Sequence, residues 1–276
     1  MPKTLAYLGP RGTFTEEAAI RYNPDLKLQS EPTIVSVGAA VLSSPNIIGI
    51  IPIENSLEGA VTYSQDLLIS EPSLSIYGEI ILPINHYLIT QHGRSKDEIE
   101  IIYSHPQSFA QCKNYLEKNF LGINQVASLS NALAVTTMLA SQNKSAAIAP
   151  QRTATIYDAA IIDSKIQDQS NNETRFVILN QQDHQPTGND KTSICISFKE
   201  DKPGSLYKVL GIFAEKMINL TKVESRPTKE TLGRYHFLID CLGHRTEPIL
   251  SRCLTDVGNE VFKLSILGSY PIFENH

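Results

Sequence analysis

Short apolar segments and helix-like segments alternate along the first 150 residues of this chain. Five apolar segments have the composition of buried strands: residues 4–8, 46–53, 80–90, 99–103 and 145–149. The lone His86 in the third of them is interpreted as a structural residue rather than a catalytic one. This alternation predicts an α/β architecture with mainly parallel sheets. Ligands of such sheets bind at the carboxyl ends of strands, so the residues that follow each strand are the first candidates for a site.

Polar turns follow three of the predicted strands. The turn over residues 12–16 places a threonine three residues before a glutamate, which is the spacing of a helix capping box. The turn at Asn55–Ser56 offers two suitable N-cap residues, and the turn at Ser104–Gln107 has a proline where the first helical turn accepts one. Helix starts of this kind bind anions because their first amides are unpaired. The alternative is that each turn is a plain strand–helix connection.

A polar segment precedes the last strand-like stretch of this region. Residues 171–179 begin with Asn-Asn-Glu-Thr-Arg and then become apolar and β-branched. The neutral hydroxyl of Thr174 therefore stands beside the permanent cation of Arg175, a combination that suits chemistry on a small dianion. The alternative is a strand entry with an ion pair and a core aromatic residue.

The order of elements changes after residue 180. Residues 181–190 lack apolar periodicity and contain proline and glycine, which predicts a linker. Beyond the linker, predicted strands and helices follow in the order βαββαβ between residues 191 and 267. This order is typical of the ferredoxin-like arrangement and predicts a second, smaller domain.

Charge and composition exclude several classes of function. Residues 1–189 hold 12 basic against 18 acidic residues, a net charge of −6, whereas residues 190–276 hold 12 against 11, a net charge of +1. An acidic first region argues against nucleic-acid binding, which depends on neutralising phosphates. The longest apolar run, residues 47–53, is too short to span a bilayer, and a strand at residue 4 leaves no room for a signal peptide. Four widely spaced cysteines without a CxxC pair favour free thiols in a reducing cytoplasm and no zinc site.

Four short motifs, in the right order along the chain, resemble those of prephenate dehydratases. They are Leu-Gly-Pro-Arg-Gly-Thr-Phe at 8–14, Pro-Ile-Glu-Asn-Ser at 52–56, Ser-His-Pro-Gln at 104–107 and Asn-Glu-Thr-Arg-Phe at 172–176. Each motif is weak alone, but the ordered set is specific and, with the second domain, covers nearly the whole chain. That domain resembles an ACT regulatory domain, because residues 204–206 and 218–227 are similar to its two phenylalanine-binding motifs.

The resemblance implies an α/β fold with a catalytic region of two subdomains, shaped like a type II periplasmic binding protein, and a ferredoxin-like βαββαβ ACT domain. The active site is expected between the two subdomains. The expected boundaries are 1–180 for the catalytic region, with subdomains at about 1–77 plus 158–180 and at 78–157, then 181–190 for the linker and 191–276 for the ACT domain.

The implied activity is the decarboxylating dehydration of prephenate to phenylpyruvate in L-phenylalanine biosynthesis, with feedback inhibition by L-phenylalanine. Aromatisation supplies much of the driving force, so the enzyme mainly assists departure of the hydroxyl group. One rival is arogenate dehydratase, whose substrate carries an amine in place of the keto group. Another is a non-catalytic amino-acid sensor that binds without turnover. Neither a cofactor nor a metal is expected.

The resemblance also assigns residues to roles. Thr174 is expected to donate a hydrogen bond to the leaving hydroxyl, because threonine is too weak an acid for ordinary general acid catalysis. Arg175 either grips a substrate carboxylate or pairs with a protein carboxylate, and Glu54 is either a proton donor or a salt-bridge partner. Asn55 and Ser56 complete the expected catalytic set. The expected substrate-binding residues are Gly12, Thr13, Phe14, Ser104, His105, Gln107 and Phe176. The expected phenylalanine-binding residues are Gly204, Ser205, Leu206, Asn219, Leu220, Glu224, Ser225 and Arg226.

Two departures from the family pattern bear on regulation and on domain content. Ser205 stands where the family often has alanine, and the bulky Tyr207 follows closely, which leaves the strength and sign of the phenylalanine response open. Many relatives carry a fused chorismate mutase domain upstream, and a strand at residue 4 leads us to expect that this activity is absent. Pairing of ACT domains predicts a homodimer or homotetramer, with contacts through both the ACT and the catalytic domains.

Overall fold

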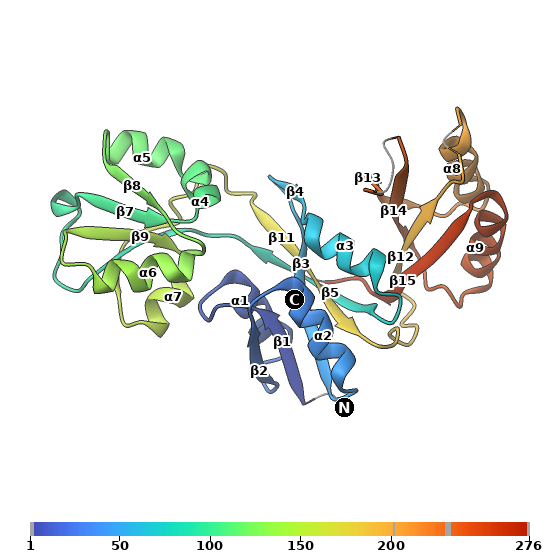
Figure 1. The fold of residues 1–276 in the computed structure, drawn as a ribbon, viewed down its shortest axis with the longest axis horizontal. Coiled ribbons are helices and arrows are strands. Elements are labelled where there is room, and N and C mark those ends of the chain that lie inside the picture. Colours follow the sequence, from blue (N-terminus) through green and yellow to red (C-terminus); the bar gives the residue numbers. More distant parts are fainter. Residues whose placement is uncertain (1–2, 201, 230–232, 275–276) are drawn as a thin grey trace.

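The computed structural model describes residues 3–200, 202–229 and 233–274, which form three bodies in a row (Figure 1). We call the middle body the central lobe and the body that contains β7 (Ile101–Ser104) the outer lobe. The body that contains α8 (Ser205–Glu215) and α9 (Pro248–Glu260) is the C-terminal domain. Each body is built around one sheet, and helices pack on every sheet. The predicted fold class, two α/β lobes followed by a βαββαβ domain, is confirmed.

The central lobe contains the first strands of the chain and one strand that returns from the outer lobe. Its sheet has the order β2-β1-β3-β11-β5, with β4 beside β3. The strands β1, β2 and β3 are parallel, while β11 pairs antiparallel with both β3 and β5. Its elements are β1 (Thr4–Leu8), α1 (Phe14–Tyr22), β2 (Lys27–Glu31), α2 (Ile34–Ser43), β3 (Ile47–Asn55), β4 (Gly59–Ala60), α3 (Thr62–Ser70), β5 (Ser75–Pro83) and β11 (Glu173–Asn180).

The outer lobe repeats this plan. Its sheet has the order β10-β6-β9-β7-β8, in which β7, β8 and β9 are parallel and β6 pairs antiparallel with β9 and β10. In each five-stranded path, four strands therefore point one way, and the strand that enters from the other lobe points the opposite way. Its elements are β6 (Tyr87–Thr90), the 3-10 helix η1 (Lys96–Glu98), β7 (Ile101–Ser104), α4 (Pro106–Gln111), α5 (Lys113–Asn119), β8 (Asn124–Ala127), α6 (Asn131–Ala140), β9 (Ser145–Ala149), α7 (Gln151–Ile156) and β10 (Ala160–Ser164).

Three local predictions were wrong. The helix predicted to start at Asn55–Ser56 begins only at Thr62, because β3 runs on to Asn55 and a tight turn follows. The strand predicted over residues 80–90 is two strands, β5 and β6, so His86 lies in the connection between the lobes. The helix predicted after Pro106 is interrupted at Cys112, which separates α4 from α5.

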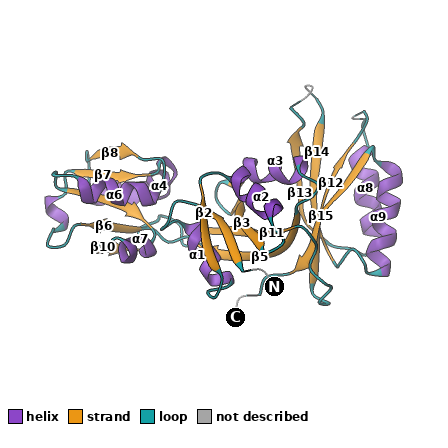
Figure 2. Ribbon diagram, turned by 60° about the horizontal axis from the view of Figure 1, so that its bottom comes forward, coloured by secondary structure: helices purple, strands orange, loops and turns teal. Residues whose placement is uncertain are grey.

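The C-terminal domain has the predicted βαββαβ order. Its antiparallel sheet runs β13-β14-β12-β15, and α8 and α9 cover the face that points away from the central lobe (Figure 2). Its elements are β12 (Asp190–Ser197), α8 (Ser205–Glu215), β13 (Leu220–Pro227), β14 (Tyr235–Leu242), α9 (Pro248–Glu260) and β15 (Lys263–Pro271). None of the helices in the described ranges combines the length and the apolar character that a bilayer crossing needs.

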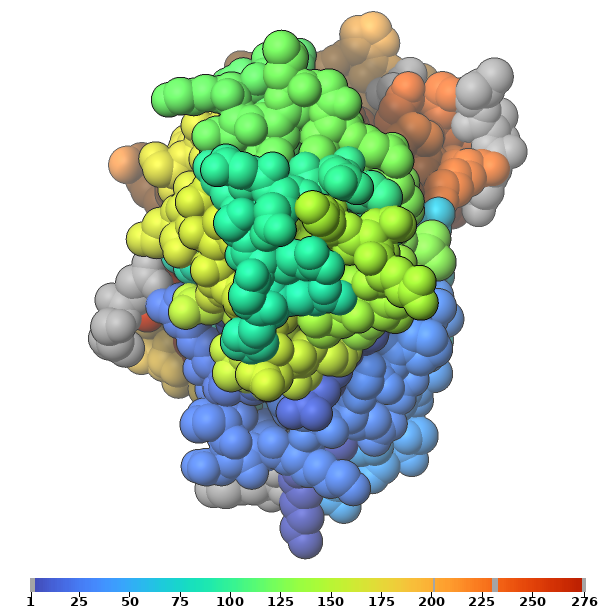
Figure 3. All heavy atoms as spheres, turned by 90° about the vertical axis from the view of Figure 1, so that its left-hand side faces the viewer, coloured from blue at the N-terminus to red at the C-terminus, as the bar shows by residue number. Residues whose placement is uncertain are grey.

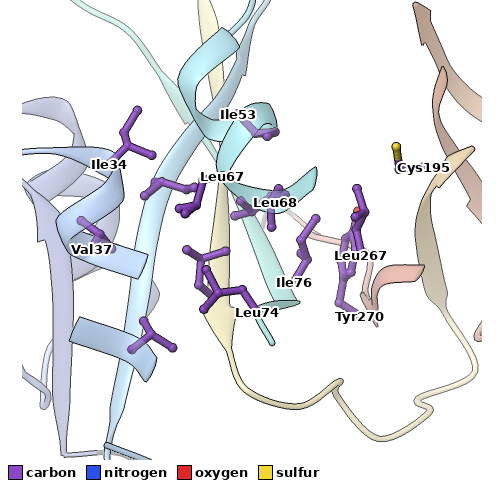
Figure 4. Close-up of a cluster of buried hydrophobic side chains, with 14 of the residues drawn as sticks. Ile34, Val37, Ile53, Leu67, Leu68, Leu74, Ile76, Cys195, Leu267 and Tyr270 are labelled. Atoms are coloured by element: carbon purple, nitrogen blue, oxygen red, sulfur yellow. The ribbon is translucent and has the colours of Figure 1, made fainter. Parts of the chain in front are cut away.

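The open face of the C-terminal sheet packs against the central lobe through a continuous apolar cluster. Ile53, Leu68 and Ile76 of the central lobe belong to the same buried cluster as Leu267 and Tyr270 of β15 (Figure 4). The two backbones approach closely, since a Cβ atom on Gly268 would lie 2.2 Å from the carbonyl oxygen of Ile76. The C-terminal domain is therefore docked on the central lobe by a shared core.

Candidate active site

A cavity of about 380 Å³ lies between the central and outer lobes. Its walls come from the ends of β1, β3 and β11 on one side and from α4, the start of α6 and the end of β9 on the other. The residues that line it include no lysine, arginine, aspartate or glutamate. Its polar lining consists of Thr13, Thr15, Asn55, His86, His105, Gln107, Ser108, Gln111, Ser130, Asn131 and Thr174. An anion in this cavity would therefore be held by neutral donors and helix N-termini.

The strand β11 presents alternate residues to the cavity. Thr174 and Phe176 line it, whereas Arg175 points to the opposite face, as the two-residue period of a strand requires. On the neighbouring strand β3, Pro52 and Asn55 both line the cavity although they are three residues apart. A register shift between β3 and β11 at this point explains the broken alternation, because a bulge turns Asn55 back towards Thr174.

The Thr174 hydroxyl is oriented by Asn55. The Asn55 amide donates from Nδ2 to Thr174 Oγ1 over 2.9 Å and to Asn172 Oδ1 over 2.8 Å. The Asn55 Oδ1 atom accepts the backbone amides of Leu57 and Glu58, both at 3.0 Å, so the side-chain amide cannot turn over. Within the described ranges the Thr174 hydroxyl donates no hydrogen bond. Because the hydroxyl accepts from Asn55, its own proton is free for a ligand.

Three further residues complete a chain of hydrogen bonds to Thr174, and none of them was predicted. Asn172 Nδ2 donates to Gln111 Oε1 over 2.9 Å, and His86 Nε2 lies 2.8 Å from the same oxygen. An amide oxygen only accepts, so His86 carries its proton on Nε2. Two features of the sequence could have suggested two of these residues as part of the site. Asn172 lies two residues before Thr174, and Gln111 lies one helical turn after Gln107.

Burial keeps His86 neutral and makes the stability of the fold depend on pH. His86 is 2% exposed, and burial lowers the pKa of its imidazole. As the pH falls below about 6.5, His86 binds a proton in the unfolded chain but stays neutral in the folded protein. The free energy of unfolding therefore falls. We expect urea denaturation between about pH 7 and pH 5.5 to show a steeper loss of stability for the wild type than for His86→Gln. Equal slopes for the two proteins would contradict this role of His86.

The motif at 104–107 contributes unequally to the cavity. His105 and Gln107 line it, and His105 caps α4 by accepting the Gln107 amide on Nδ1. Ser104 is fully buried, and its hydroxyl donates to the carbonyl oxygen of Ile148 over 3.0 Å. Asn131 holds this region together, since its Oδ1 accepts from the Ser108 hydroxyl and from the His105 amide. Ser104 therefore lies outside the cavity and supports the residues that line it.

The glycine turn at residues 9–12 joins the two lobes. Thr13 is the N-cap of α1, as predicted, and Thr13 and Phe14 line the cavity. The Gly12 amide donates to the buried carboxylate of Glu16 over 2.8 Å, which removes it from ligand binding. Arg152 of the outer lobe donates to the same carboxylate over 2.9 Å. Figure 3 shows the green and yellow outer lobe lying directly against the blue central lobe along this boundary.

Arg175 is bound by protein carboxylates. Its guanidinium donates to Glu79 Oε2, to Asp240 Oδ2 and to the Tyr270 hydroxyl, each over 2.7 Å. Burial alone would raise the pKa of Asp240, but Arg175 and the Ser193 hydroxyl outweigh burial and hold that pKa below its ordinary value. Of the two interpretations of Arg175, the geometry matches the pairing with protein carboxylates.

Glu54 and Ser56 also lie outside the cavity. The Glu54 carboxylate accepts from Lys222 Nζ over 3.0 Å on the same face of the sheet as Arg175, so it matches the salt-bridge interpretation. Ser56 is exposed, and its hydroxyl donates to the Asn171 carbonyl oxygen while accepting the Glu173 amide. The cavity thus brings together Thr13, Phe14, Asn55, His105, Gln107, Thr174 and Phe176, and leaves out Gly12, Glu54, Ser56, Ser104 and Arg175.

Residues 204–206, which resemble a phenylalanine-binding motif, open α8. Gly204 is the N-cap and adopts φ +87°, a left-handed conformation that favours glycine, and Ser205 and Leu206 begin the helix. The strands β12 and β13 are both antiparallel to β14, so the start of α8 and the end of β13 lie at the same end of the sheet. The Gly204 turn and Arg226 are therefore at one end, whereas Asn219 and Leu220 are at the other.

Residues of the second motif contact the central lobe. Glu224 accepts from Gln65 Nε2 over 2.7 Å, and Arg226 pairs with Asp66 over 2.6 Å, both on α3. Ser225 is exposed on the other side of β13. Two of the motif's polar side chains thus bind the same chain's catalytic region. In the described ranges, no three histidine, cysteine or carboxylate side chains are grouped closely enough to hold a metal ion.

Fold and site together define a two-lobed α/β protein with a neutral polar cavity between its lobes and an ACT-like domain docked on one of them. Residues 5–184 match the family described as prephenate dehydratase, and residues 199–259 match the ACT domain. The chain belongs to the prephenate dehydratase family.

Individual relatives agree with this membership over the full length. The prephenate dehydratase of Methanocaldococcus jannaschii is 37% identical over 281 residues, which covers 99% of this chain and all of that protein. The structure of prephenate dehydratase from Arthrobacter aurescens in complex with L-Phe has a TM-score of 0.90 at 30% identity, over 98% of this chain and 90% of that one. A structure described as a quorum quenching acylase has a TM-score of 0.88 at 27% identity, over 98% of each chain.

Proposed function

We propose that the protein converts prephenate to phenylpyruvate, with loss of water and carbon dioxide, in L-phenylalanine biosynthesis. The observation that carries this proposal is the Thr174 hydroxyl, which Asn55 holds as a hydrogen-bond donor inside the inter-lobe cavity. It lies in a chain whose family membership is clear from its relatives. The reaction needs such a donor, because hydroxide is a poor leaving group.

The helix N-termini at the cavity suit a dianionic substrate. Thr13 and Ser130, the N-caps of α1 and α6, both line the cavity, and the first amides of a helix are unpaired and carry partial positive charge. With no cationic side chain in the lining, these dipoles are the groups that would hold the two carboxylates. A neutral lining also avoids stabilising the ring carboxylate too strongly, since that group must depart as carbon dioxide.

Thr174 acts by oriented donation in this mechanism. No carboxylate lines the cavity, and Glu54 is engaged with Lys222 on the other face of the sheet. Thr174 therefore stabilises negative charge as it develops on the departing oxygen, and electrons released by decarboxylation complete the aromatic ring. The expelled hydroxide becomes water by taking a proton from the solvent. Asn55, Asn172 and Gln111 position the hydroxyl before the substrate arrives.

The cavity gives little support to acylase chemistry. An acylase that uses a hydroxyl nucleophile needs a base to take its proton. The neighbour of Thr174 Oγ1 is the Asn55 amide nitrogen, which donates and cannot accept. Arogenate dehydration remains the nearer rival, because its substrate differs only by an amine in place of the keto group.

Product analysis with both substrates tests the proposal. We expect prephenate to be converted to phenylpyruvate, and arogenate to react more slowly because no lining carboxylate is available to bind its ammonium group. Phenylpyruvate and phenylalanine are separated by liquid chromatography after each reaction. We also expect added L-phenylalanine to lower the rate. Binding of prephenate without product would favour the sensor, and faster conversion of arogenate would favour the rival enzyme.

The same proposal assigns roles to the domains of the chain, and an assembly and a location to the protein. We assign residues 1–180 to catalysis, residues 181–190 to the linker and residues 191–276 to phenylalanine-dependent regulation. The expected subdomain boundaries at 77 and 158 are corrected, because β5 (Ser75–Pro83) belongs to the sheet of the central lobe and β10 (Ala160–Ser164) to the sheet of the outer lobe. The two phenylalanine-binding motifs would act with those of a second chain in a homodimer or homotetramer. A cytoplasmic location is supported by the four cysteines, which are all free and buried.

A further inference from the structure

Seven charged side chains form one cluster between the central lobe and the C-terminal domain. We call it the interdomain ion cluster. Arg175 pairs with Glu79 and Asp240, both over 2.7 Å, while Lys191 and Lys222 reach Glu79 and Glu54, both over 3.0 Å. Arg175 also lies 3.8 Å from Glu54, so the contacts are continuous. Glu224 also pairs with Lys222 over 3.0 Å. The members are therefore Glu54, Glu79 and Arg175 of the central lobe and Lys191, Lys222, Glu224 and Asp240 of the C-terminal domain.

The cluster is shared by both bodies, and most of it is buried, although the Glu54 side chain is 37% exposed. The side chains of Glu79, Asp240 and Arg175 are 1%, 9% and 13% exposed. The central lobe contributes two carboxylates and one cation, and the C-terminal domain contributes two cations and two carboxylates. Every strand of the C-terminal sheet takes part: Lys191 lies on β12, Lys222 on β13, Asp240 on β14 and Tyr270, which accepts from Arg175, on β15.

The cluster lies directly behind the hydrogen bond that orients Thr174. Thr174 pairs with Asn55 in the sheet, and the next pair in the register is Arg175 with Glu54. Glu54 thus immediately precedes Asn55 on β3, and Arg175 immediately follows Thr174 on β11. Both cluster residues point to the face of the sheet opposite the cavity. A planar guanidinium held by three acceptors has little freedom to shift, so the backbone on which it stands is fixed as well.

We propose that Arg175 and Glu54 are positioning residues, through which the C-terminal domain sets the geometry of the Asn55–Thr174 pair. The inference rests on the proposed function, since Thr174 is the donor in that reaction. Moving β11 by a fraction of an ångström relative to β3 would lengthen the hydrogen bond that points the Thr174 hydroxyl into the cavity.

Docking of the domain by itself does not require this cluster. The apolar contacts of Ile76 and Leu68 with Leu267 already join the two bodies in one core. Buried ion pairs contribute little net stability, because desolvation offsets their attraction, but they hold groups in one arrangement. The location of the cluster next to Thr174, rather than elsewhere in the interface, points to positioning.

Two variants of the C-terminal domain test the inference without touching the cavity. Tyr270→Phe removes one acceptor of Arg175 with almost no change of volume, and Asp240→Asn removes the charge of a second. Asp66→Asn is the matched control, since Asp66 pairs with Arg226 and Lys229 across the same interface and, in the described ranges, forms no ion pair with β3 or β11. All three full-length proteins are assayed with prephenate and without phenylalanine, and hydrogen exchange of residues 173–180 is measured by mass spectrometry.

We expect kcat to fall by up to about 10²-fold in Asp240→Asn and less in Tyr270→Phe, with KM nearly unchanged, because misplacement of a reacting group acts on turnover. Exchange in β11 should rise in both variants and stay at the wild-type value in Asp66→Asn. Wild-type kcat and exchange in both variants would overturn the inference, as would an equal loss in the control. If the wild type does not turn over prephenate, the proposed function fails, and exchange in β11 still decides whether the cluster positions that strand.

Discussion

Replacing Thr174 by valine is expected to lower kcat by about 10²–10³-fold, the usual loss when one preorganised donor to a developing negative charge is removed. Valine has nearly the same shape, so the cavity keeps its volume and KM for prephenate should change little. The Asn55 amide loses one acceptor but retains Asn172 Oδ1 and the Glu173 carbonyl oxygen, so the fold is expected to persist. Steady-state kinetics with prephenate, together with a thermal melt, measure both effects.

Thr174→Ser is the matched control for this substitution. Serine keeps the hydroxyl that accepts from Asn55 and loses only a methyl group, so most of the turnover should remain. A kcat for Thr174→Val within a few-fold of the wild type would remove Thr174 from the chemistry. A large loss in Thr174→Ser would show that the methyl group, by its packing, matters more than the donor.

The second large effect is expected for Asn55→Asp, which reverses the direction of a hydrogen bond without changing the shape of the side chain. An ionised carboxylate only accepts, so the Thr174 hydroxyl would donate to residue 55 instead of donating to the substrate. We expect kcat to fall by about 10²–10³-fold, as if the hydroxyl were absent. The variant also places a negative charge beside a dianionic substrate, and KM should therefore rise.

A double-mutant cycle separates these two causes. If Asn55→Asp acts on kcat through the Thr174 hydroxyl, adding it to Thr174→Val should lower kcat little further, because the donor is already missing. If the new charge acts on its own, the two losses in kcat should multiply. Full multiplication would contradict the proposed orientation of Thr174 by Asn55.

Much of the architecture was predictable from local patterns. The period of apolar residues placed most of the strands, and the capping residue Thr13 marked the start of α1 correctly. The βαββαβ order of the C-terminal domain was also correct. These features depend on residues a few positions apart, where backbone geometry and side-chain capping act directly. The predicted helix start at Asn55–Ser56 failed because both residues satisfy a turn and the returning strand β11 instead.

The site depended more on distant contacts. Gln111 and His86 reach Thr174 only because the chain crosses between the lobes twice and brings residues 86, 111 and 172 to one place. No local period indicates such a meeting. The unpredicted residues Asn172 and Gln111 lie close in sequence to the recognised motifs, which is the signal that would have suggested them.

Sequence alone determined that Thr174 and Arg175 stand at the start of a strand, where successive side chains alternate between its two faces. Only the tertiary structure decided which face is the cavity and what lies behind it. The partners of Arg175 come from residues 79, 240 and 270, on strands of two different bodies. Likewise, Asn55 faces Thr174 because pairing with β11 shifts the register of β3. Such contacts arise from the packing of complete sheets, and local propensity carries no information about which sheets will meet.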